Sequence, residues 1–266
     1  MEVKYVNAMN LQEIQQIAPD VAMALGYFDG VHLGHQKVIG TTRQKAQQQN
    51  LSLAVLSFFP HPKSVLFADN EVAYLEPLEQ KIEKLEQLGV DVFYVVEFTK
   101  DLAKAEANDF IDEYVIGLNA KEIICGFDYT YGRKASGTVE TLTLYASAHQ
   151  VGVTVVEELK WNEQKISSTL IRKLITDCKL SDIPNILGDY YKTKYCKKNG
   201  LLPNYTLPSL GDYKVFIEDN GSLIESFVTV RSKKQIQMHE ELSMLPNLLT
   251  IHWIEKVDFF KLNQAL

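Results

Sequence analysis

The segment Gly26–His35, which reads GYFDGVHLGH, holds residues of this chain that are suited to chemistry on phosphate. The apolar run Val21–Phe28 predicts a buried strand, and the helix that opens at Gly34 would turn its first amide N–H groups toward an anion. His32 and His35 stand at this helix start. An imidazole donates hydrogen bonds to phosphoryl oxygens and, as a cation, offsets their charge. The segment therefore predicts a turn that binds a phosphate and stabilises its transfer.

Two other interpretations of this histidine pair stay open. The first is a plain turn and helix with two solvent-facing histidines, because short motifs often occur by chance. The second is a metal hydrolase, in which a catalytic zinc would need a third protein ligand, either His61 or a carboxylate. The spacing between His32 and His35, with a glycine inside, fits a helix start better than the i,i+4 pair of a zinc-binding helix. The position directly after a buried strand favours the phosphate interpretation.

A second group of polar residues, Ser167-Ser168-Thr169, lies much later in the chain and is followed by Arg172. Serine and threonine are favoured helix N-caps, and the helix Leu170–Cys178 would bring Arg172 to nearly the same face as Thr169. A phosphate at this helix start would meet hydroxyl, amide and guanidinium donors together. Taken alone, the segment also fits a plain N-cap with a solvated arginine.

Strands and helices alternate over the first part of the chain. Apolar runs predict strands at 21–28, 51–59, 90–98, 122–127 and 151–157, and helical spacing predicts helices at 35–49, 78–88, 107–118 and 138–150. Pro60 and Pro62 end the second strand, and Gly89 stands where a helix C-cap is expected. This alternation predicts an α/β domain of Rossmann-like type, with a parallel sheet covered on both faces and binding groups at the carboxyl ends of its strands.

The pattern changes after about Asp182. Short alternating stretches follow at 213–218, 224–231, 235–239 and 248–256. Asn220-Gly221 between two of them is a hairpin signal, because both residues tolerate positive φ. We predict a small, mostly antiparallel β domain over residues 183–266, after a first domain over residues 1–182. A β domain of this size has a marginal core of its own.

Composition argues against several classes of protein. The 266 residues carry 27 Lys and Arg against 34 Asp and Glu, a net charge of -7, whereas proteins that bind nucleic-acid backbones are usually basic. No apolar run approaches the ~20 residues that cross a bilayer, and the amino terminus has no secretory pattern. Cys125, Cys178 and Cys196 are too scattered for a disulfide framework. We expect a cytoplasmic protein without nucleic-acid or membrane partners, and we assign no protein partner.

Four segments follow the order of motifs in a known family. GYFDGVHLGH looks like the HxGH nucleotidyltransferase signature of the prokaryotic riboflavin kinase/FAD synthetase family, and Phe58–Pro62 (FFPHP) resembles its PHP motif at a strand end. Gly126–Gly137 resembles the family's GxDFxFGxxxxG loop, and Ile166–Arg172 (ISSTLIR) resembles its ISSTxIR motif. One such motif is weak, whereas four in order are specific.

The resemblance implies an FMN adenylyltransferase, in which ATP and FMN become FAD and pyrophosphate with Mg²⁺. FMN brings its own nucleophile, a phosphate with nearly two charges at pH 7 if its second pKa is the ~6 of other phosphomonoesters. The enzyme then has to align the substrates and stabilise charge on the α-phosphate and the pyrophosphate. We predict four catalytic residues: His32, His35, Ser168 and Arg172. The predicted ATP-binding residues are Gly26, Phe28, Asp29, Gly30, His32, Gly34, His35, Ser167, Ser168, Thr169 and Arg172.

The resemblance also places the flavin beside two of these segments. Pro60-His61-Pro62 offers a rigid extended edge, while Tyr129 and Tyr131 share one side of an extended segment, where their rings suit either an isoalloxazine or a core. The predicted FMN-binding residues are Phe58, Pro60, His61, Pro62, Asp128, Tyr129 and Tyr131. Asp128 is alternatively a Mg²⁺ ligand, and the metal ligands stay unassigned. Phe59 stands where the family often has an acidic residue, and the two tyrosines replace phenylalanines.

The carboxyl-terminal domain lacks parts of the family's riboflavin kinase. In bifunctional members this domain is a β-barrel with a GxPTAN segment and a glutamate base in an ExH-like stretch. Here residues 199–206 contain no PTAN, and the nearest match to the second stretch is Gln237-Met238-His239. A neutral amide cannot accept the proton of a ribityl hydroxyl. The resemblance thus implies an FAD synthetase with a degenerate kinase domain. The alternatives are a bifunctional enzyme and a flavin-binding regulator with a relict site.

Overall fold

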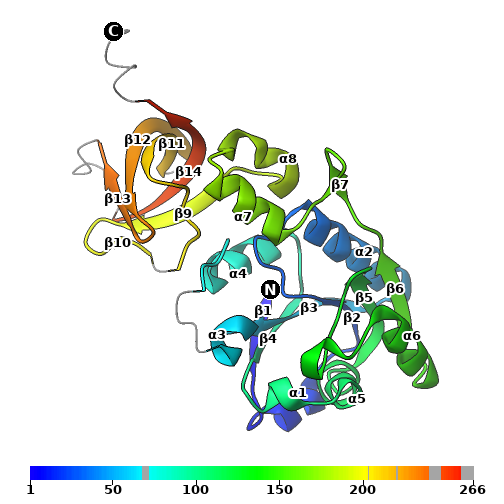
Figure 1. Ribbon diagram of the computed structural model, residues 1–266. Coiled ribbons are helices and arrows are strands. Elements are labelled where there is room, and N and C mark those ends of the chain that lie inside the picture. The colour runs from blue at the N-terminus through cyan, green and yellow to red at the C-terminus, as the bar shows by residue number, and fades with distance from the viewer. Residues whose placement is uncertain (68–71, 203, 220, 240–246, 259–266) are drawn as a thin grey trace. The chain divides into compact units, whose positions relative to one another are not determined.

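A computed structural model describes residues 1–67, 72–202, 204–219, 221–239 and 247–258 of the chain (Figure 1). The described residues fall into two compact units. The first unit comprises residues 1–72 and 78–159, and the second comprises residues 73–77 and 160–266. The sequence predicts a boundary between two functional domains at residue 182. This boundary stays a prediction.

The first unit is built on a six-stranded sheet in the order β1-β4-β3-β2-β5-β6. All neighbouring strands in this sheet are parallel. Their bounds are β1 Glu2–Val6, β2 Val21–Leu25, β3 Ser52–Phe59, β4 Val92–Glu97, β5 Ala120–Gly126 and β6 Gly152–Val156. The strand order reverses at β2, which has β3 on one side and β5 on the other. In such sheets ligands bind beyond the carboxyl ends of the strands, at the point of reversal.

Helices cover both faces of this sheet (Figure 1). Their bounds are α1 Leu11–Ile17, α2 Leu33–Gln49, α3 Pro62–Leu66, α4 Leu78–Gln87, α5 Ala107–Phe110 and α6 Val139–Ala148, with short helical segments η1 Leu102–Lys104, η2 Ile111–Ile116 and η3 Arg133–Ala135. The alternation of side chains along β2 separates two cores. Met23 packs in the core shared with α1, η2 and α6, whereas Ala22 and Ala24 pack in the core shared with α2 and α4. The predicted Rossmann-like α/β fold is therefore confirmed.

Most predicted elements of this unit are present with ends moved by a few residues. The strand predicted at 21–28 ends at Leu25, because Phe28 has a left-handed backbone with a φ of 52°. The helix predicted at 107–118 divides into α5 and the π-helical segment η2. The prediction missed β1 and α1, whose short and largely exposed sequences carry little apolar periodicity.

The second unit combines a few helices with short strands. Its elements are β7 Lys160–Trp161, β8 Gln164–Lys165, α7 Ser168–Thr176, η4 Leu180–Asp182, α8 Pro184–Leu187, β9 Tyr191–Cys196, β10 Gly200–Leu201, β11 Gly211–Asp219, β12 Ser222–Ser232, β13 Gln235–Met238 and β14 Leu248–Val257. Strands β10-β9-β14-β11-β12-β13 form an antiparallel, barrel-like sheet, as predicted. β11 and β12 pair from Asp219 and Ser222, so a tight hairpin joins them, and Gly221 has the positive φ expected there. Asn220 lies outside the described residues.

Large aromatic side chains fill the core of this barrel-like sheet. Trp253, Tyr191 and Tyr213 are fully buried. Their polar atoms have partners inside, because the Trp253 Nε1–H donates to Thr193 Oγ1 at 3.0 Å and the Tyr191 hydroxyl donates to the Thr206 carbonyl at 2.7 Å.

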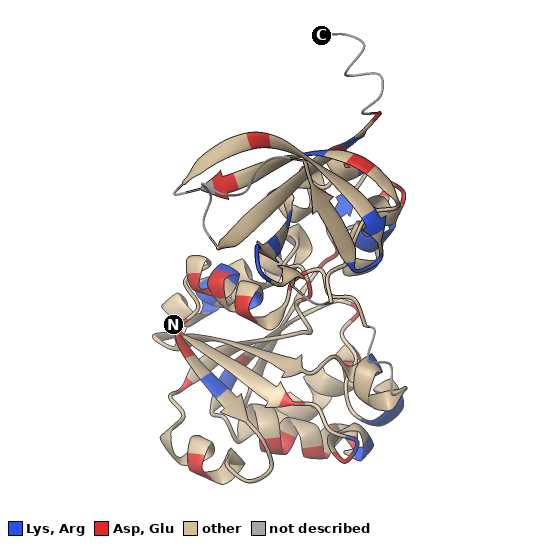
Figure 2. Ribbon diagram, turned by 90° about the vertical axis from the view of Figure 1, so that its left-hand side faces the viewer, with Lys and Arg blue, Asp and Glu red and all other residues tan. Residues whose placement is uncertain are grey.

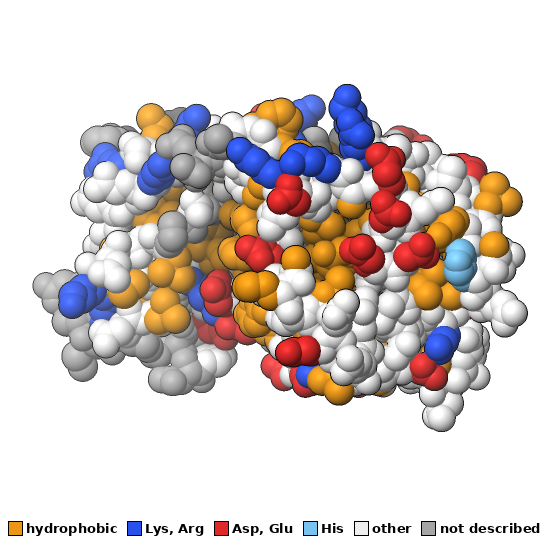
Figure 3. All heavy atoms as spheres, turned by 90° about the horizontal axis from the view of Figure 1, so that it is seen from below, with side chains coloured by type: hydrophobic (Ala, Val, Ile, Leu, Met, Phe, Trp, Pro, Cys, Tyr) orange, Lys and Arg blue, Asp and Glu red, His pale blue; other side chains and the backbone are white. Residues whose placement is uncertain are grey.

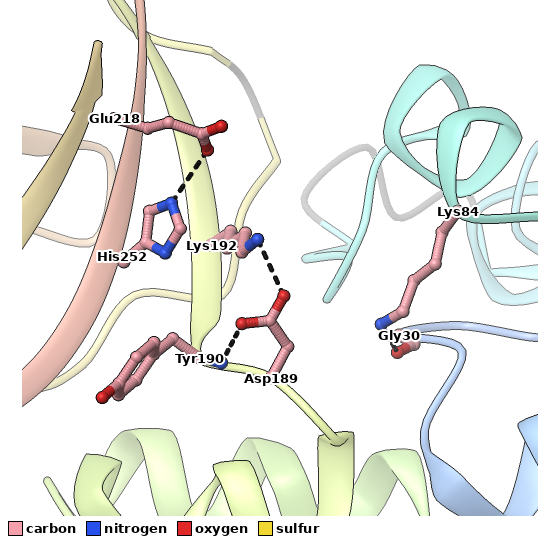
Figure 4. A network of polar contacts seen from close by, with 7 residues as sticks. All are labelled: Gly30, Lys84, Asp189, Tyr190, Lys192, Glu218 and His252. Carbon is pink, nitrogen blue, oxygen red and sulfur yellow. Dashed lines mark hydrogen bonds and ion pairs between the residues drawn. The ribbon is translucent and has the colours of Figure 1, made fainter. Parts of the chain in front are cut away.

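Charged residues occur on helices, loops and strands of the chain (Figure 2). Two polar pairs of the second unit lie near the start of β9: His252 Nε2 is 3.0 Å from Glu218 Oε2, and Lys192 Nζ is 2.7 Å from Asp189 Oδ2 (Figure 4). Among the described residues, no helix is both long enough and apolar enough to cross a bilayer.

Candidate active site

His32 is the N-cap of α2, at the carboxyl end of the sheet's central strand β2. Its Nδ1 accepts a hydrogen bond from the backbone N–H of His35 at 3.2 Å. Because Nδ1 is the acceptor, the proton of the neutral ring belongs on Nε2, which is then a donor. The rings of His32 and His35 stack with centroids 3.6 Å apart. The predicted histidine pair at a helix start is thus present as one stacked unit.

The turn that leads to His32 has an unusual backbone. Phe28, Gly30 and Val31 have φ angles of 52°, 82° and 33°. Such conformations cost about 1–3 kcal/mol for each non-glycine residue and persist only where the surroundings hold them. A Cβ at Gly26 would lie 3.0 Å from the Phe28 ring, so a larger residue would require this ring to shift by a few tenths of an ångström. Asp29 is buried within this turn. Strain concentrated between a central strand and a helix N-terminus is typical of a functional turn.

Two lysines of α4 bind the carbonyl groups of this turn. Lys81 Nζ donates to the Tyr27 carbonyl at 2.8 Å, and Lys84 Nζ donates to the Gly30 carbonyl at 3.2 Å (the second is drawn in Figure 4). Neither lysine was among the predicted site residues. In the sequence they appear as charged positions of an amphipathic helix, which are usually solvated.

The second predicted segment follows β3. His61 is the N-cap of α3, and its Nδ1 accepts a hydrogen bond from the Lys63 N–H at 3.0 Å. Pro62 begins α3, so the expected extended edge over Pro60-His61-Pro62 is wrong at its last residue. The physical reason is that proline is favoured in the first turn of a helix, where no backbone N–H is required. The His61 ring meets the Tyr27 ring edge to face at 4.5 Å, which connects this segment to the His32 turn.

A cavity of about 370 Å³ lies within the first unit. It is lined by Phe58, Pro62, Leu66, Phe98, Leu102, Ala103, Phe110, Thr130, Tyr131, Gly132, Lys134 and Ala135. Apolar and aromatic side chains predominate, and among the described residues that line it Lys134 alone is charged. In the view of Figure 3, hydrophobic side chains gather near the middle of the visible surface, with acidic and basic side chains around them. The volume and the lining suit a flat aromatic ligand with few polar groups.

Three of the predicted flavin residues, Phe58, Pro62 and Tyr131, line this cavity. Pro60, His61, Asp128 and Tyr129 are not among its lining residues. Leu66, Phe98, Leu102 and Phe110 also line the cavity and were not predicted, because an apolar side chain that lines a cavity gives the same sequence pattern as one that fills a core.

The two tyrosines of the Gly126–Gly137 loop have different surroundings. Their rings stack at 5.7 Å, as expected for alternate positions. Tyr129 packs against the core, and its burial raises the pKa of its hydroxyl. Burial also raises the pKa of Tyr131, so both hydroxyls stay neutral at physiological pH. A Cβ at Gly137 would lie 2.5 Å from the Tyr131 ring, and this close approach explains the glycine. Asp128 is exposed.

The Ile166–Arg172 segment belongs to the second unit. Ser167 is the N-cap of α7, and its Oγ accepts a hydrogen bond from the Leu170 N–H at 3.2 Å. Arg172 folds back toward this helix start, where its Nη1 donates to the Ser168 carbonyl at 3.4 Å and its Nη2 to the Ala73 carbonyl at 3.1 Å. Thr169 is exposed in the first turn. Hydroxyl, amide and guanidinium groups therefore gather at one end of α7, as the spacing predicts.

The stretch that resembles part of a kinase site lies at the end of β13 and pairs with β12. Gln237 Oε1 accepts two hydrogen bonds from Arg231, from Nε at 3.0 Å and from Nη2 at 2.8 Å. Nearby, the Thr229 hydroxyl bonds both the Asp212 carboxylate and His239 Nε2. The position expected for a base is thus an amide whose oxygen is bound by an arginine.

No group of three or more His, Cys, Asp or Glu side chains suited to a metal ion occurs in the part of the chain that the structure describes. Mg²⁺ commonly keeps several waters and binds through substrate phosphates and one or two carboxylates. The described side chains do not form a metal cage of their own, so we assign no ligand and no chemical step to the metal.

Comparisons with known proteins identify the family of this chain. The model of the FAD synthetase family matches residues 14–170. The bifunctional riboflavin kinase/FMN adenylyltransferase of Bacillus subtilis is 42% identical over 229 residues, which cover 79% of this chain and 72% of that protein. The FAD synthetase of Listeria monocytogenes is 31% identical over 232 residues, which cover 83% of this chain and 92% of that protein.

A solved structure supports the fold. The crystal structure described as a macrolide-efflux protein from Streptococcus pneumoniae aligns with a TM-score of 0.82 and 24% identity, covering 97% of this chain and 100% of that one. The match over residues 14–170 and the two relatives show that the chain belongs to the FAD synthetase family and is an FMN adenylyltransferase, a nucleotidyltransferase.

Proposed function

We propose that this chain transfers the adenylyl group of ATP to FMN, giving FAD and pyrophosphate, and that it has no riboflavin kinase activity. The observation that carries the first part is the stacked His32–His35 pair at the N-terminus of α2, next to the point where the strand order reverses. An anionic triphosphate suits this place because the helix N-terminus presents N–H groups and positive potential.

In the proposed reaction a phosphate oxygen of FMN attacks the α-phosphorus of ATP, and the bond from that phosphorus to the bridging oxygen of pyrophosphate breaks. Negative charge rises on the α-phosphate and on the departing pyrophosphate. The His32 Nε2–H and the N–H groups that open α2 donate to these oxygens. No residue has to act as a nucleophile. From the sequence motif alone, we propose that the residues at the start of α7 supply hydroxyl and guanidinium donors to ATP phosphates; they are Ser167, Ser168, Thr169 and Arg172.

The apolar cavity supports the flavin side of the proposal. An isoalloxazine ring is flat and aromatic, and Phe58, Pro62 and Tyr131 offer it apolar edges and faces. The contact between the rings of His61 and Tyr27 connects the two places, because His61 precedes Pro62 of the cavity and Tyr27 belongs to the turn that leads to His32. We propose that the ring enters the cavity and that Mg²⁺ arrives with ATP. We also propose that the protein works in the cytoplasm without a nucleic-acid partner, in line with its net charge of -7.

The absence of kinase activity is proposed from Gln237. Phosphorylation of riboflavin needs a base for the ribityl hydroxyl, and an amide that accepts two hydrogen bonds from Arg231 cannot serve. The competing candidate is a bifunctional enzyme, which is favoured by the names of several relatives, among them proteins of Bacillus subtilis and Listeria monocytogenes.

A single assay separates these candidates. The purified chain is incubated with ATP and Mg²⁺, and with either FMN or riboflavin, and the flavins are separated by chromatography. The proposal expects FAD from FMN and neither FMN nor FAD from riboflavin. FMN formed from riboflavin would establish the bifunctional candidate. Tight flavin binding without FAD or pyrophosphate would indicate a regulator instead.

A further inference from the structure

Lys81 is a buried lysine whose position the adenylyl-transfer chemistry described above does not explain. Its side chain is 3% exposed, although it lies on α4, a helix with a charged face. A lysine ammonium is rarely buried without partners, because removing the charge from water is costly. Here the Nζ donates to the Tyr27 carbonyl at 2.8 Å and approaches Ser57 Oγ at 3.5 Å.

The Tyr27 carbonyl is the point where these contacts meet. The Ser57 hydroxyl on β3 donates to the same carbonyl at 2.7 Å, so two donors from two elements fix one peptide group. This peptide leads directly into Phe28, whose φ of 52° needs such restraint. Lys81 therefore holds the turn that presents His32.

Lys81 also contacts the ring of the same residue. Its Nζ lies 4.6 Å from the centroid of the Tyr27 ring, within the range of a cation–π interaction. The Tyr27 ring also contacts the His61 ring, and the two ring centroids are 4.5 Å apart. His61 caps α3, whose residues Pro62 and Leu66 line the apolar cavity.

We propose that Lys81 is a positioning residue that couples the two substrate sites of the first unit, by fixing Tyr27 between the His32 turn and the His61 segment. The inference rests on the proposed function, because it takes the His32 turn as the ATP side and the cavity as the FMN side. Binding of the nucleotide then changes the affinity for FMN, and this change depends on Lys81. Reciprocity requires FMN to change the nucleotide affinity by the same factor.

The test measures the dissociation constant of FMN from its fluorescence, with and without a saturating non-hydrolysable ATP analogue and Mg²⁺. The wild-type chain is expected to show a difference of about fivefold or more, the lower end of common coupling. In Lys81→Met the difference is expected to fall below about twofold, while FMN affinity without nucleotide changes little. If Lys81 only stabilised the fold, Lys81→Met would lower the melting temperature and leave the ratio of the two FMN dissociation constants unchanged.

Two further variants keep the test decisive if Lys81→Met does not fold. Tyr27→Leu keeps the backbone carbonyl but removes the ring between Lys81 and His61, and it is expected to lose the coupling as well. Lys84→Met removes the neighbouring lysine that binds Gly30, keeps the Tyr27 contacts, and is expected to retain the coupling.

The results are separable from those of the proposed function. A wild-type chain that makes FAD but shows no coupling overturns the inference alone, as does a folded Lys81→Met or Tyr27→Leu variant that keeps the wild-type ratio. A wild-type chain that makes no FAD from FMN and ATP overturns the proposed function and the inference with it.

Discussion

The His32 turn of the first unit and the Gln237 stretch of the second unit place different demands on their side chains. Stabilising a phosphate in transfer needs hydrogen-bond donors, and His32, His35 and the N-terminus of α2 supply them. Removing a proton from an alcohol needs a base of suitable pKa, and at Gln237 an amide bound by Arg231 stands there instead. On the proposed function, one chain therefore carries a donor site in its first unit and, in its second unit, a site in which an amide replaces the base.

The largest expected effect concerns His32. We expect His32→Ala to lower kcat for FAD formation by about 100- to 1,000-fold, the loss that follows removal of one oriented donor, about 2.7–4 kcal/mol. Initial rates of pyrophosphate release with FMN and ATP measure this. The same change removes the cap of α2 and should cost about 1 kcal/mol of unfolding free energy.

His32→Asn separates these two roles. Asparagine is a good N-cap, so it should restore the stability that His32→Ala loses, yet it lacks an Nε2–H in the same place and should stay slow. If His32→Asn recovers the wild-type rate, His32 acts only as a helix cap and does not stabilise the phosphate in transfer.

The second expected effect concerns the apolar cavity. Leu66→Asp places a carboxylate at a residue that lines it and that is already half exposed, so the fold should tolerate the change. We expect KM for FMN to rise by about 10- to 100-fold, because an unpaired charge facing an apolar ligand costs roughly 1–3 kcal/mol. KM for ATP should change little.

Leu144→Asp, at an exposed leucine of α6 that does not line the cavity, is the matched control. Equal KM values for FMN in wild type and Leu66→Asp would place the flavin elsewhere.

A smaller effect is expected at Gly137. A Cβ there would lie 2.5 Å from the Tyr131 ring, so Gly137→Ala forces the ring to move. We expect a loss of about 1–3 kcal/mol in unfolding free energy, as for other overpacked positions, together with a weaker affinity for FMN. Chemical denaturation and FMN fluorescence measure the two. Gly221→Ala in the second unit, where a Cβ would meet nothing within 4 Å but the φ is positive, should destabilise the chain without affecting FMN.

The smallest expected effect concerns Gln237 in the second unit. Gln237→Glu supplies a carboxylate, but Arg231 lies within hydrogen-bond distance and would pair with it. We expect no FMN from riboflavin with this variant, because a paired carboxylate is a weaker base and the PTAN segment is still missing. Appearance of FMN would show that the second unit lacks only its base.

Much of the fold follows from apolar periodicity. The all-buried strand β2 and the helix α4 with its C-terminal Gly89 have the patterns expected of a central parallel strand and an amphipathic helix. β1 could not be predicted in this way, because it is an edge strand in which Glu2 and Tyr5 are exposed and Lys4 is partly exposed.

The candidate site was predictable where polar residues mark it. The histidines of the turn and the Ser167 cap could be predicted, because their side chains form hydrogen bonds and their positions at helix starts are visible in the sequence. Phe98, Leu102 and Phe110 do not, since only the three-dimensional arrangement distinguishes the wall of a cavity from a core. Lys81 could not be found either, because burial of one lysine on a charged helix depends on the turn packed against it.

His32 and Arg172 are both predicted catalytic residues, and the sequence motifs in which they lie assign them to one ATP molecule. The most direct measurement is a double-mutant cycle with His32→Ala, Arg172→Ala and the double variant, in which single-turnover rates of FAD formation from FMN and ATP are compared. Groups that act on one transition state are strongly non-additive, so the account predicts that the double variant is about as slow as the slower single variant. Rate reductions that simply multiply would contradict it.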